Sequence, residues 1–236
     1  ENSGMSERQL GEIPAADPTA HVDRQGHVFF ADPTAGEEVQ LPGDDQPQDV
    51  VAQLFPYADT FRLNSRPGAQ RTIYLDFTGY RVSNTIHQAR QHVSEPHTSP
   101  AWSRDGSPSF NAEEQNVIQQ VWARVVEDFA AWDVNITTQE PPQSDITRSG
   151  TDDHRYGQRV VISDDRPFHA ACECGGIAGT FGAFDFTSNH AYYDPVYVLH
   201  AASSSVHIIA TTVTHEVGHN LGLLHDGYGS DAYYID

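Results

Sequence analysis

From about residue 71 onward, apolar residues recur with the two periods that distinguish strands from helices. Arg71 to Thr78 is a β-branched and aromatic run that predicts a strand, and Asn111 to Trp132 carries apolar residues at helical spacing, behind a capping box of Asn111 and Glu114. Further strands are predicted at Val134 to Thr138, Arg159 to Ser163, Gly176 to Phe186 and Pro195 to Leu199, and a second long helix at about Ser203 to Leu221. This order predicts an α/β (α+β) domain in which a mixed, twisted sheet carries the helices.

Residues 1–67 have a different composition, rich in Pro, Gly, Asp and Gln, with short apolar patches at His27 to Phe30 and Val50 to Phe55. Such a segment has little core of its own. We therefore expect an N-terminal extension over residues 1–67, a junction at Ser65 to Gly68, and one domain over residues 68–236.

The chain is strongly acidic. Its 236 residues carry a formal net charge of −20, and every basic residue is an arginine. This charge repels phosphate backbones and anionic membranes, so we expect no nucleic-acid or membrane partner. No apolar run is long enough to span a bilayer, and the N-terminus lacks the features of a signal peptide, which processing could already have removed. The acidity fits a soluble secreted protein from an arginine-favouring genome and equally an adaptation to high salt.

The most specific pattern comes at the end of the second predicted helix. His215, Glu216, His219, Gly222 and His225 stand there at the spacing of a catalytic zinc site. Residues four apart on a helix differ by about 40° around the axis and about 6 Å along it, so His215 and His219 share one face and can bind one ion. His225 reaches that ion only if the helix ends before it, and Gly222 suits the left-handed conformation that such an ending needs.

Three neutral imidazoles leave one position of a tetrahedral Zn²⁺ for water, whose pKa falls to about 7. Glu216 adjoins the first ligand without binding the metal, which suits a general base that takes the water's proton and passes it to the leaving amine. The alternative is an amphipathic helix with surface histidines. It is the weaker interpretation, because a chance match at five fixed positions is rare even in a chain with 13 histidines.

This motif resembles that of the metzincin zinc endopeptidases, which share the glycine and the third histidine. Asp226 is similar to the aspartate that follows the third histidine in the reprolysin-like branch and in secreted bacterial metzincins, where it supports the active-site turn. The resemblance extends from about Arg71 to the end of the chain through residues 72–77, 134–138, 160–163 and 175–178. It implies the upper subdomain of that fold, a Zn²⁺ cofactor, a protein or peptide substrate, and a secreted, extracellular enzyme.

In that family an antiparallel edge strand borders the cleft and pairs with the substrate backbone. The best match consists of Ala178, Gly179, Thr180, Phe181 and Gly182, whose small residues suit the approach of an extended peptide. The alternative is a glycine-loosened strand that packs normally.

One family feature does not follow the third histidine. Metzincins have a methionine turn under the zinc, whereas the only methionine here is Met5 and the sequence ends at Asp236. We expect residues 68–236 to be C-terminally incomplete, with the methionine turn on a missing segment. The alternative is a site that is built differently.

The resemblance also implies that the extension is a pro-segment, which keeps a secreted peptidase inactive by donating a side chain to the zinc. A cysteine donor is excluded, because no Cys precedes Cys172. The carboxylate and imidazole candidates are Asp17, His21, Asp23, His27 and Asp32. The alternative is an N-terminal arm that packs beside the domain.

A secreted zinc endopeptidase is therefore the leading hypothesis. The alternative is a latent zymogen or a non-catalytic peptide- or protein-binding module of the same fold. Glu216 argues against a purely structural zinc site, which normally fills its fourth position with a protein ligand.

Other metal-ligating residues have simpler interpretations. Cys172 and Cys174 form a small local disulfide or stay as free thiols, and we expect no second metal site from them. His87, His92 and His97 are expected in a solvated loop, and His169, His190, His200 and His207 in structural or surface positions. The glycosylation sequon at Asn135 falls on a predicted strand, so we interpret it as a chance match.

Overall fold

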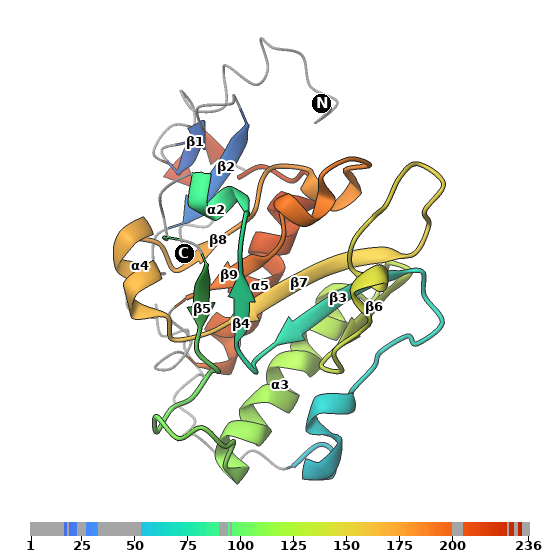
Figure 1. Ribbon diagram of the computed structural model, residues 1–236. Coiled ribbons are helices and arrows are strands. Elements are labelled where there is room, and N and C mark those ends of the chain that lie inside the picture. The colour runs from blue at the N-terminus through green and yellow to red at the C-terminus, as the bar shows by residue number, and fades with distance from the viewer. Residues whose placement is uncertain are drawn as a thin grey trace.

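The computed structural model describes residues 17, 19–22, 27–32, 53–89, 94, 96–199, 205–225, 227–228 and 231–232. Within them, a seven-stranded sheet has the strand order β1-β2-β8-β9-β7-β3-β6 (Figure 1). In that order its strands are β1 (Ala20–Val22), β2 (Val28–Asp32), β8 (Gly176–Ile177), β9 (Val196–Val198), β7 (Tyr156–Ile162), β3 (Arg71–Asp76) and β6 (Val134–Thr137).

The sheet is mixed. Strands β6, β3, β7 and β9 run parallel to one another, and β8 pairs antiparallel with β9. Strand β2 then pairs antiparallel with β8, placing Ala31 opposite Ile177 and Asp32 opposite Gly176. Strand β1 completes this side as the antiparallel partner of β2. The N-terminal extension thus adds two strands to the sheet, and β2 covers the edge that β8 would otherwise present.

Helices α3 (Ala112–Asp128) and α5 (Val206–Asn220) pack against each other and against one face of the sheet. Side chains alternate along β7, so that Val160 and Ile162 join the core under these helices while Val161 faces the other way. All three valine and isoleucine side chains are fully buried. Of the two faces of the sheet, this one carries the larger apolar core, and α5 packs against the sheet through that core.

The opposite face is covered by shorter elements. They are the antiparallel pair β4 (Tyr80–Val82) and β5 (His97–Ser99), with α2 (Ile86–Ala89) between them in the chain, and α4 (Arg166–Cys172). Figure 1 shows β4 and β5 on the opposite side of the sheet from α3. Phe168 of α4 packs there with Val161 and Tyr197. The remaining short elements are η1 (Tyr57–Arg62), η2 (Gln143–Asp145), η3 (Ala183–Asp185), η4 (His190–Tyr192), β10 (Gly227–Tyr228) and β11 (Asp231–Ala232).

The predicted mixed α/β fold is confirmed at this level, with both long helices. The capping box of α3 is present, since the Asn111 side chain accepts from the Glu114 backbone and the Glu114 side chain accepts from the Asn111 backbone. That helix ends at Asp128, however, and Trp132 beyond it is exposed. Among the described residues, no helix is long and apolar enough to cross a membrane.

The predicted strand from Gly176 to Phe186 is wrong beyond Ile177, where the chain continues through bends and turns into η3. Two glycines explain the change. Gly182 has a φ of +70°, which breaks an extended backbone. At Gly179 an added Cβ would lie 1.7 Å from the carbonyl oxygen of Tyr193, so the absent side chain accommodates that backbone rather than a neighbouring strand.

Candidate metal centre

Three histidine rings converge at the C-terminal end of α5. The Nε2 atom of His219 lies 3.1 Å from that of His215 and 3.1 Å from that of His225, and the latter two are 2.9 Å apart. Hydrogen bonds between the rings do not explain all three of these short distances, because a neutral imidazole donates from only one of its nitrogens. Tetrahedral zinc with Zn–N bonds of about 2.0–2.1 Å places two ligand nitrogens about 3.3 Å apart. The triangle therefore has the size of one face of a tetrahedral metal site.

The end of α5 explains how His225 reaches the other two rings. The helix ends at Asn220, and Gly222 follows with a φ of +91°, in the left-handed region. The Leu223 N–H donates to the Gly218 carbonyl and the Gly222 N–H to the His219 carbonyl, which closes the last turn. The chain then reverses, and residue 225 comes back beside the helix.

Two of the rings are oriented by hydrogen bonds at their other nitrogen. Nδ1 of His219 lies 2.8 Å from the Leu223 carbonyl oxygen, and Nδ1 of His225 lies 2.5 Å from a carboxylate oxygen of Asp17. Acceptors at these positions select the tautomer with the proton on Nδ1. The Nε2 lone pairs of both rings then point into the centre, which is the state a metal requires.

Asp32, at the end of β2, faces all three histidines. One of its carboxylate oxygens lies 3.4 Å from Nε2 of both His215 and His219, and the other lies 3.1 Å from Nε2 of His225. Burial acts to raise the pKa of the Asp32 carboxyl, but its contacts with the three imidazole rings outweigh burial and hold the pKa well below its ordinary value. Asp32 and the three histidines thus form a cluster that could hold a metal ion, with their donor atoms within 4.8 Å of one another.

The donor set fits a metal such as zinc. Three imidazoles and one carboxylate are common zinc ligands, and imidazole also suits copper, nickel and iron. Asp32 comes from the extension. Its carboxylate lies beside the triangle of Nε2 atoms, where the fourth ligand of a tetrahedral ion would bind. Among the candidates from the extension, the structure brings Asp32 to the histidines and places Asp17 behind the ring of His225.

Glu216 lies beside this cluster without belonging to it. Its side chain is fully buried, and burial followed by the charge of Asp32 raises its pKa well above the usual value. Gly176 of β8 packs directly on it, since a Cβ added there would lie 2.3 Å from one carboxyl oxygen of Glu216. The absence of a side chain at position 176 therefore lets the Glu216 carboxyl fit between α5 and β8.

The residues predicted to bind substrate lie next to β2. The carbonyl oxygen of Val28 accepts hydrogen bonds from the Phe181 N–H at 3.0 Å and from the Thr180 hydroxyl at 2.6 Å. Gly182 donates to the carbonyl oxygen of His219 at 3.0 Å, which connects this segment to the histidine and aspartate cluster. Residues 178–182 thus contact both an extended segment of the chain and the end of α5, although they do not form a strand themselves.

Asp226 and Asp23 lie outside the described residues, as do His92 and His200. His21 stacks on Phe29, and His27 contacts the Tyr193 ring, so neither reaches the cluster.

His87 corrects the expectation of a solvated loop, since it is fully buried. Its ring packs edge-on against Phe168 and Tyr197, and its Nε2 lies 2.9 Å from the Pro195 carbonyl oxygen. His97 is partly buried, with its Nε2 2.5 Å from a carboxylate oxygen of Asp165. Both histidines therefore have structural contacts that their five-residue spacing does not indicate.

The other side chains have structural roles. His190 is buried with its Nε2 3.1 Å from the Phe184 carbonyl oxygen, whereas His169 and His207 are exposed or partly so. Asn135 is only 8% exposed, and its amide group hydrogen-bonds to Asn64 and to the Arg66 N–H. A glycan attached to Asn135 would have to displace these hydrogen bonds, which agrees with the interpretation of the sequon as a chance match.

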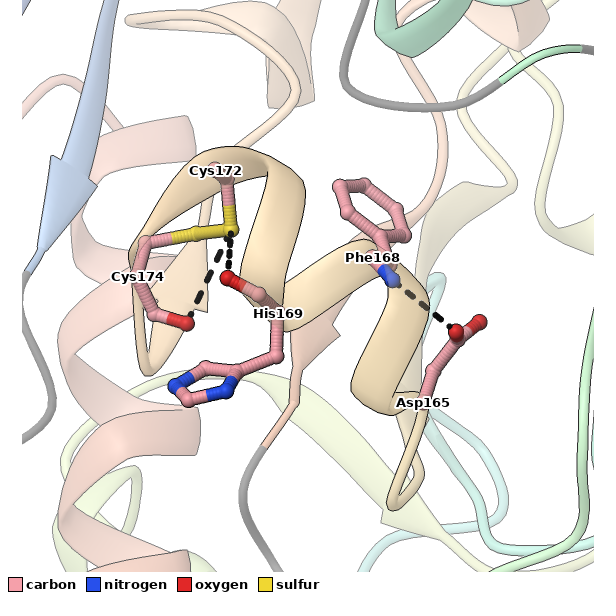
Figure 2. Close-up of a disulfide and its surroundings, with 5 residues drawn as sticks. All are labelled: Asp165, Phe168, His169, Cys172 and Cys174. Atoms are coloured by element: carbon pink, nitrogen blue, oxygen red, sulfur yellow. Dashed lines mark hydrogen bonds between the residues drawn. A yellow bond between two sulfur atoms is a disulfide. The ribbon is translucent and has the colours of Figure 1, made fainter.

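Cys172 and Cys174 are joined by a disulfide, so the free-thiol alternative is not adopted (Figure 2). Figure 2 shows this bridge at the end of α4, whose first turn is capped by the Asp165 side chain accepting from the Phe168 N–H at 3.2 Å. The bridge immediately precedes β8.

Comparison of the chain with protein-family models, with curated proteins and with solved structures found no match. What the chain's own residues establish is a mixed α/β fold with a histidine and aspartate cluster that could hold a metal ion.

Proposed function

We propose that this protein is a zinc-dependent endopeptidase that hydrolyses internal peptide bonds. The observation that supports it best is the convergence of three Nε2 atoms, from His215, His219 and His225, beside the buried carboxyl of Glu216. Zinc bound there supplies Lewis acidity towards a peptide carbonyl and lowers the pKa of water to about 7.

The chain's own groups divide the remaining work. Leu223 and Asp17 fix the rings of two histidines so that their lone pairs face the centre. Glu216 is held next to that centre by α5 and β8. Because the charge of Asp32 helps to raise its pKa, we assign Glu216 the roles of general base towards water and general acid towards the leaving amine in the form that Asp32 has left. The peptide substrate would lie along β8 and residues 178–182, in the place that β2 takes in this structure.

We also propose that the protein is secreted. The disulfide between Cys172 and Cys174 supports an oxidising compartment, because such bonds persist mainly outside the cytosol. The methionine turn implied by the metzincin resemblance stays a prediction.

A second candidate is a latent form of the same peptidase, in which the extension is an inhibitory pro-segment. Asp32 favours it, since its carboxylate lies 3.1–3.4 Å from all three Nε2 atoms and takes the side where water must bind. The same contacts also fit a non-catalytic binding module, because structural zinc sites close their fourth position with a protein ligand. Activity separates these alternatives.

The test compares the unaltered chain with Asp32→Ala on a broad mixture of internally quenched peptides. We expect Asp32→Ala to cleave faster than the unaltered chain, to lose activity with a zinc chelator, and to become inactive in combination with Glu216→Gln. Equal rates with and without Asp32 would contradict the latent form. Zinc-loaded Asp32→Ala that cleaves no peptide would contradict the peptidase and favour the binding module.

A further inference from the structure

Residues Val28–Asp32 lie on the rest of the chain as an extended peptide. Strand β2 runs antiparallel to β8, and its backbone is held at both ends by the same segment. The Val28 carbonyl accepts from the Phe181 N–H and from the Thr180 hydroxyl, and the Asp32 carbonyl accepts from the Gly175 N–H at 2.7 Å. Addition of a strand to an exposed sheet edge is a common way to bind a peptide without regard to its side chains.

The side chains of β2 then select what binds, because they alternate between two faces. Phe30 and Asp32 face the histidines. The Phe30 ring stacks on His219 with 4.1 Å between centroids and an interplanar angle of 14°, and it also packs with Phe181. Phe30 is completely buried in this position.

Phe29 points to the opposite face and is 6% exposed. It joins the apolar cluster that contains Ile177 of β8, Phe168 of α4 and Tyr197 of β9. Phe29 and Phe30 are thus buried against two different apolar surfaces. They stand three and two residues before Asp32, whose carboxylate faces the histidines. If β2 left, both surfaces would be open to water until other apolar side chains covered them.

From this arrangement we infer that the peptide ligand of the site is an extended segment with two consecutive aromatic residues, at the third and second positions before the residue that faces the metal centre. The inference rests on the proposed function in taking a peptide as the ligand, and it adds the substrate class. Phe181 contributes to the preference at the second position beside the closer stacking on His219, and it can be changed without altering a residue of the histidine and aspartate cluster.

The test measures binding, so that it does not depend on turnover. The protein is the zinc-loaded Phe30→Ala/Asp32→Ala variant of the whole chain of residues 1–236, in which the chain's own strand has lost two side chains that hold it in place. The probe is a fluorescein-labelled peptide with the sequence of residues 27–32, followed by fluorescence anisotropy. Compared with it are the same peptide with alanine at either phenylalanine position and a scrambled peptide of the same composition.

We expect each alanine peptide to bind about 10-fold more weakly or worse, because a buried aromatic side chain is lost, and the scrambled peptide to bind at the level of the weakest. Adding Phe181→Ala to the protein should shrink the loss at the position of Phe30 and leave the loss at the position of Phe29 unchanged. A thermal melt and the zinc content show that each variant is folded. Should the double variant not fold, the single variant Asp32→Ala gives the same affinity ratios, because competition from the tethered strand lowers every apparent affinity by one factor.

Equal affinities of the aromatic and alanine peptides would overturn the inference. So would the absence of binding of the aromatic peptide, up to about 1 mM, to both Phe30→Ala/Asp32→Ala and Asp32→Ala. Hydrolysis followed in the same samples separates the two proposals. Cleavage without preference for the aromatic pair leaves the peptidase standing and overturns this inference. Selective binding of the aromatic pair without cleavage supports the inference and counts against the peptidase.

Discussion

A carboxylate oxygen of Asp17 lies 2.5 Å from Nδ1 of His225, a residue 208 positions further along the chain. The Thr19 hydroxyl supports this contact, since it donates to Asp17 at 2.8 Å and lies 3.2 Å from the same Nδ1 atom. Asp32 approaches His225 from the other side, at Nε2. The extension therefore contacts the ring of His225 at both nitrogens, so its two carboxylates have different roles.

Asp17→Ala should weaken zinc binding about 10–100-fold, because His225 loses the acceptor that fixes its tautomer and orientation. Competition with a chromophoric zinc chelator measures this affinity. The matched control is Asp133→Ala, which removes an exposed carboxylate with one surface ion pair to Arg66 and should leave zinc affinity unchanged. An Asp17 variant with the zinc affinity of the control would remove Asp17 from the site.

Glu216→Gln should retain zinc and fold while lowering peptide turnover in the Asp32→Ala background by about two to four orders of magnitude, because only proton transfer is lost. Glu127→Gln changes an exposed carboxyl of α3 in the same way and serves as the control. Turnover, zinc content and melting temperature are measured together. Native turnover in Glu216→Gln would show that another group is the base.

The approach of Gly179 to Tyr193 gives a prediction about stability. A Cβ at position 179 would lie 1.7 Å from a backbone oxygen, which cannot move aside as a side chain can, so Gly179→Ala should destabilise the fold by about 2–3 kcal/mol or more. Gly68→Ala, where a Cβ meets nothing within 4 Å, should change the free energy of unfolding by about 0.5 kcal/mol or less. Urea unfolding of both variants checks this, and similar values for the two would contradict the described contact.

Asp194 gives a prediction about pH. Burial raises the pKa of its carboxyl to about 7, although the Arg159 N–H and the Gln158 amide donate hydrogen bonds that act the other way. Because the folded pKa lies above the unfolded value of about 3.9, the contribution of Asp194 to stability is greatest below about pH 4 and is lost as the pH rises to about 7, a change of up to about 4 kcal/mol.

Asp194→Asn should remove this dependence, since the amide oxygen keeps an acceptor for both donors and carries no charge. Its free energy of unfolding relative to the unaltered chain should therefore be more favourable at pH 8 than at pH 5. Urea unfolding at the two pH values gives the comparison, in which other titrating groups cancel. A difference in the free energy of unfolding that is the same at pH 5 and pH 8 would contradict the raised pKa, because it would mean that Asp194 is ionised in the folded protein at both pH values.

Local patterns in the sequence predict the parts of the structure that depend on neighbours along the chain. The amphipathic pattern and capping box give α3, and the spacing of His215, His219 and His225 gives the cluster, because a helix and a glycine turn bring them together. Strand β3 and the second half of β7 follow in the same way from their β-branched residues, whereas Tyr156 to Gln158 of β7 lie before the predicted strand.

The sequence alone does not predict which strands pair when they are far apart in the chain. The apolar patch at His27 to Phe30 is visible in the sequence, and its partner β8 is the two-residue start of the strand predicted over Gly176 to Phe186, but neither segment indicates that the two pair. Asp17 and Asp32 cannot be told apart from composition, because both are short acidic side chains of the extension. Only the alternation of β2, with Phe30 and Asp32 on one face, and its pairing with Gly176 decide which carboxylate faces the histidines. His87 was misassigned because α2, at four residues, is too short to show a helical period.

The proposed peptidase activity depends most directly on one zinc ion held by His215, His219 and His225. Elemental analysis of the unaltered protein purified without added metal tests this, together with the same measurement on His219→Ala, because Nε2 of His219 lies 3.1 Å from those of both other histidines. We predict about one zinc per chain in the unaltered protein and loss of most of it in His219→Ala. Stoichiometric zinc in that variant, or no zinc in the unaltered protein, would contradict the account.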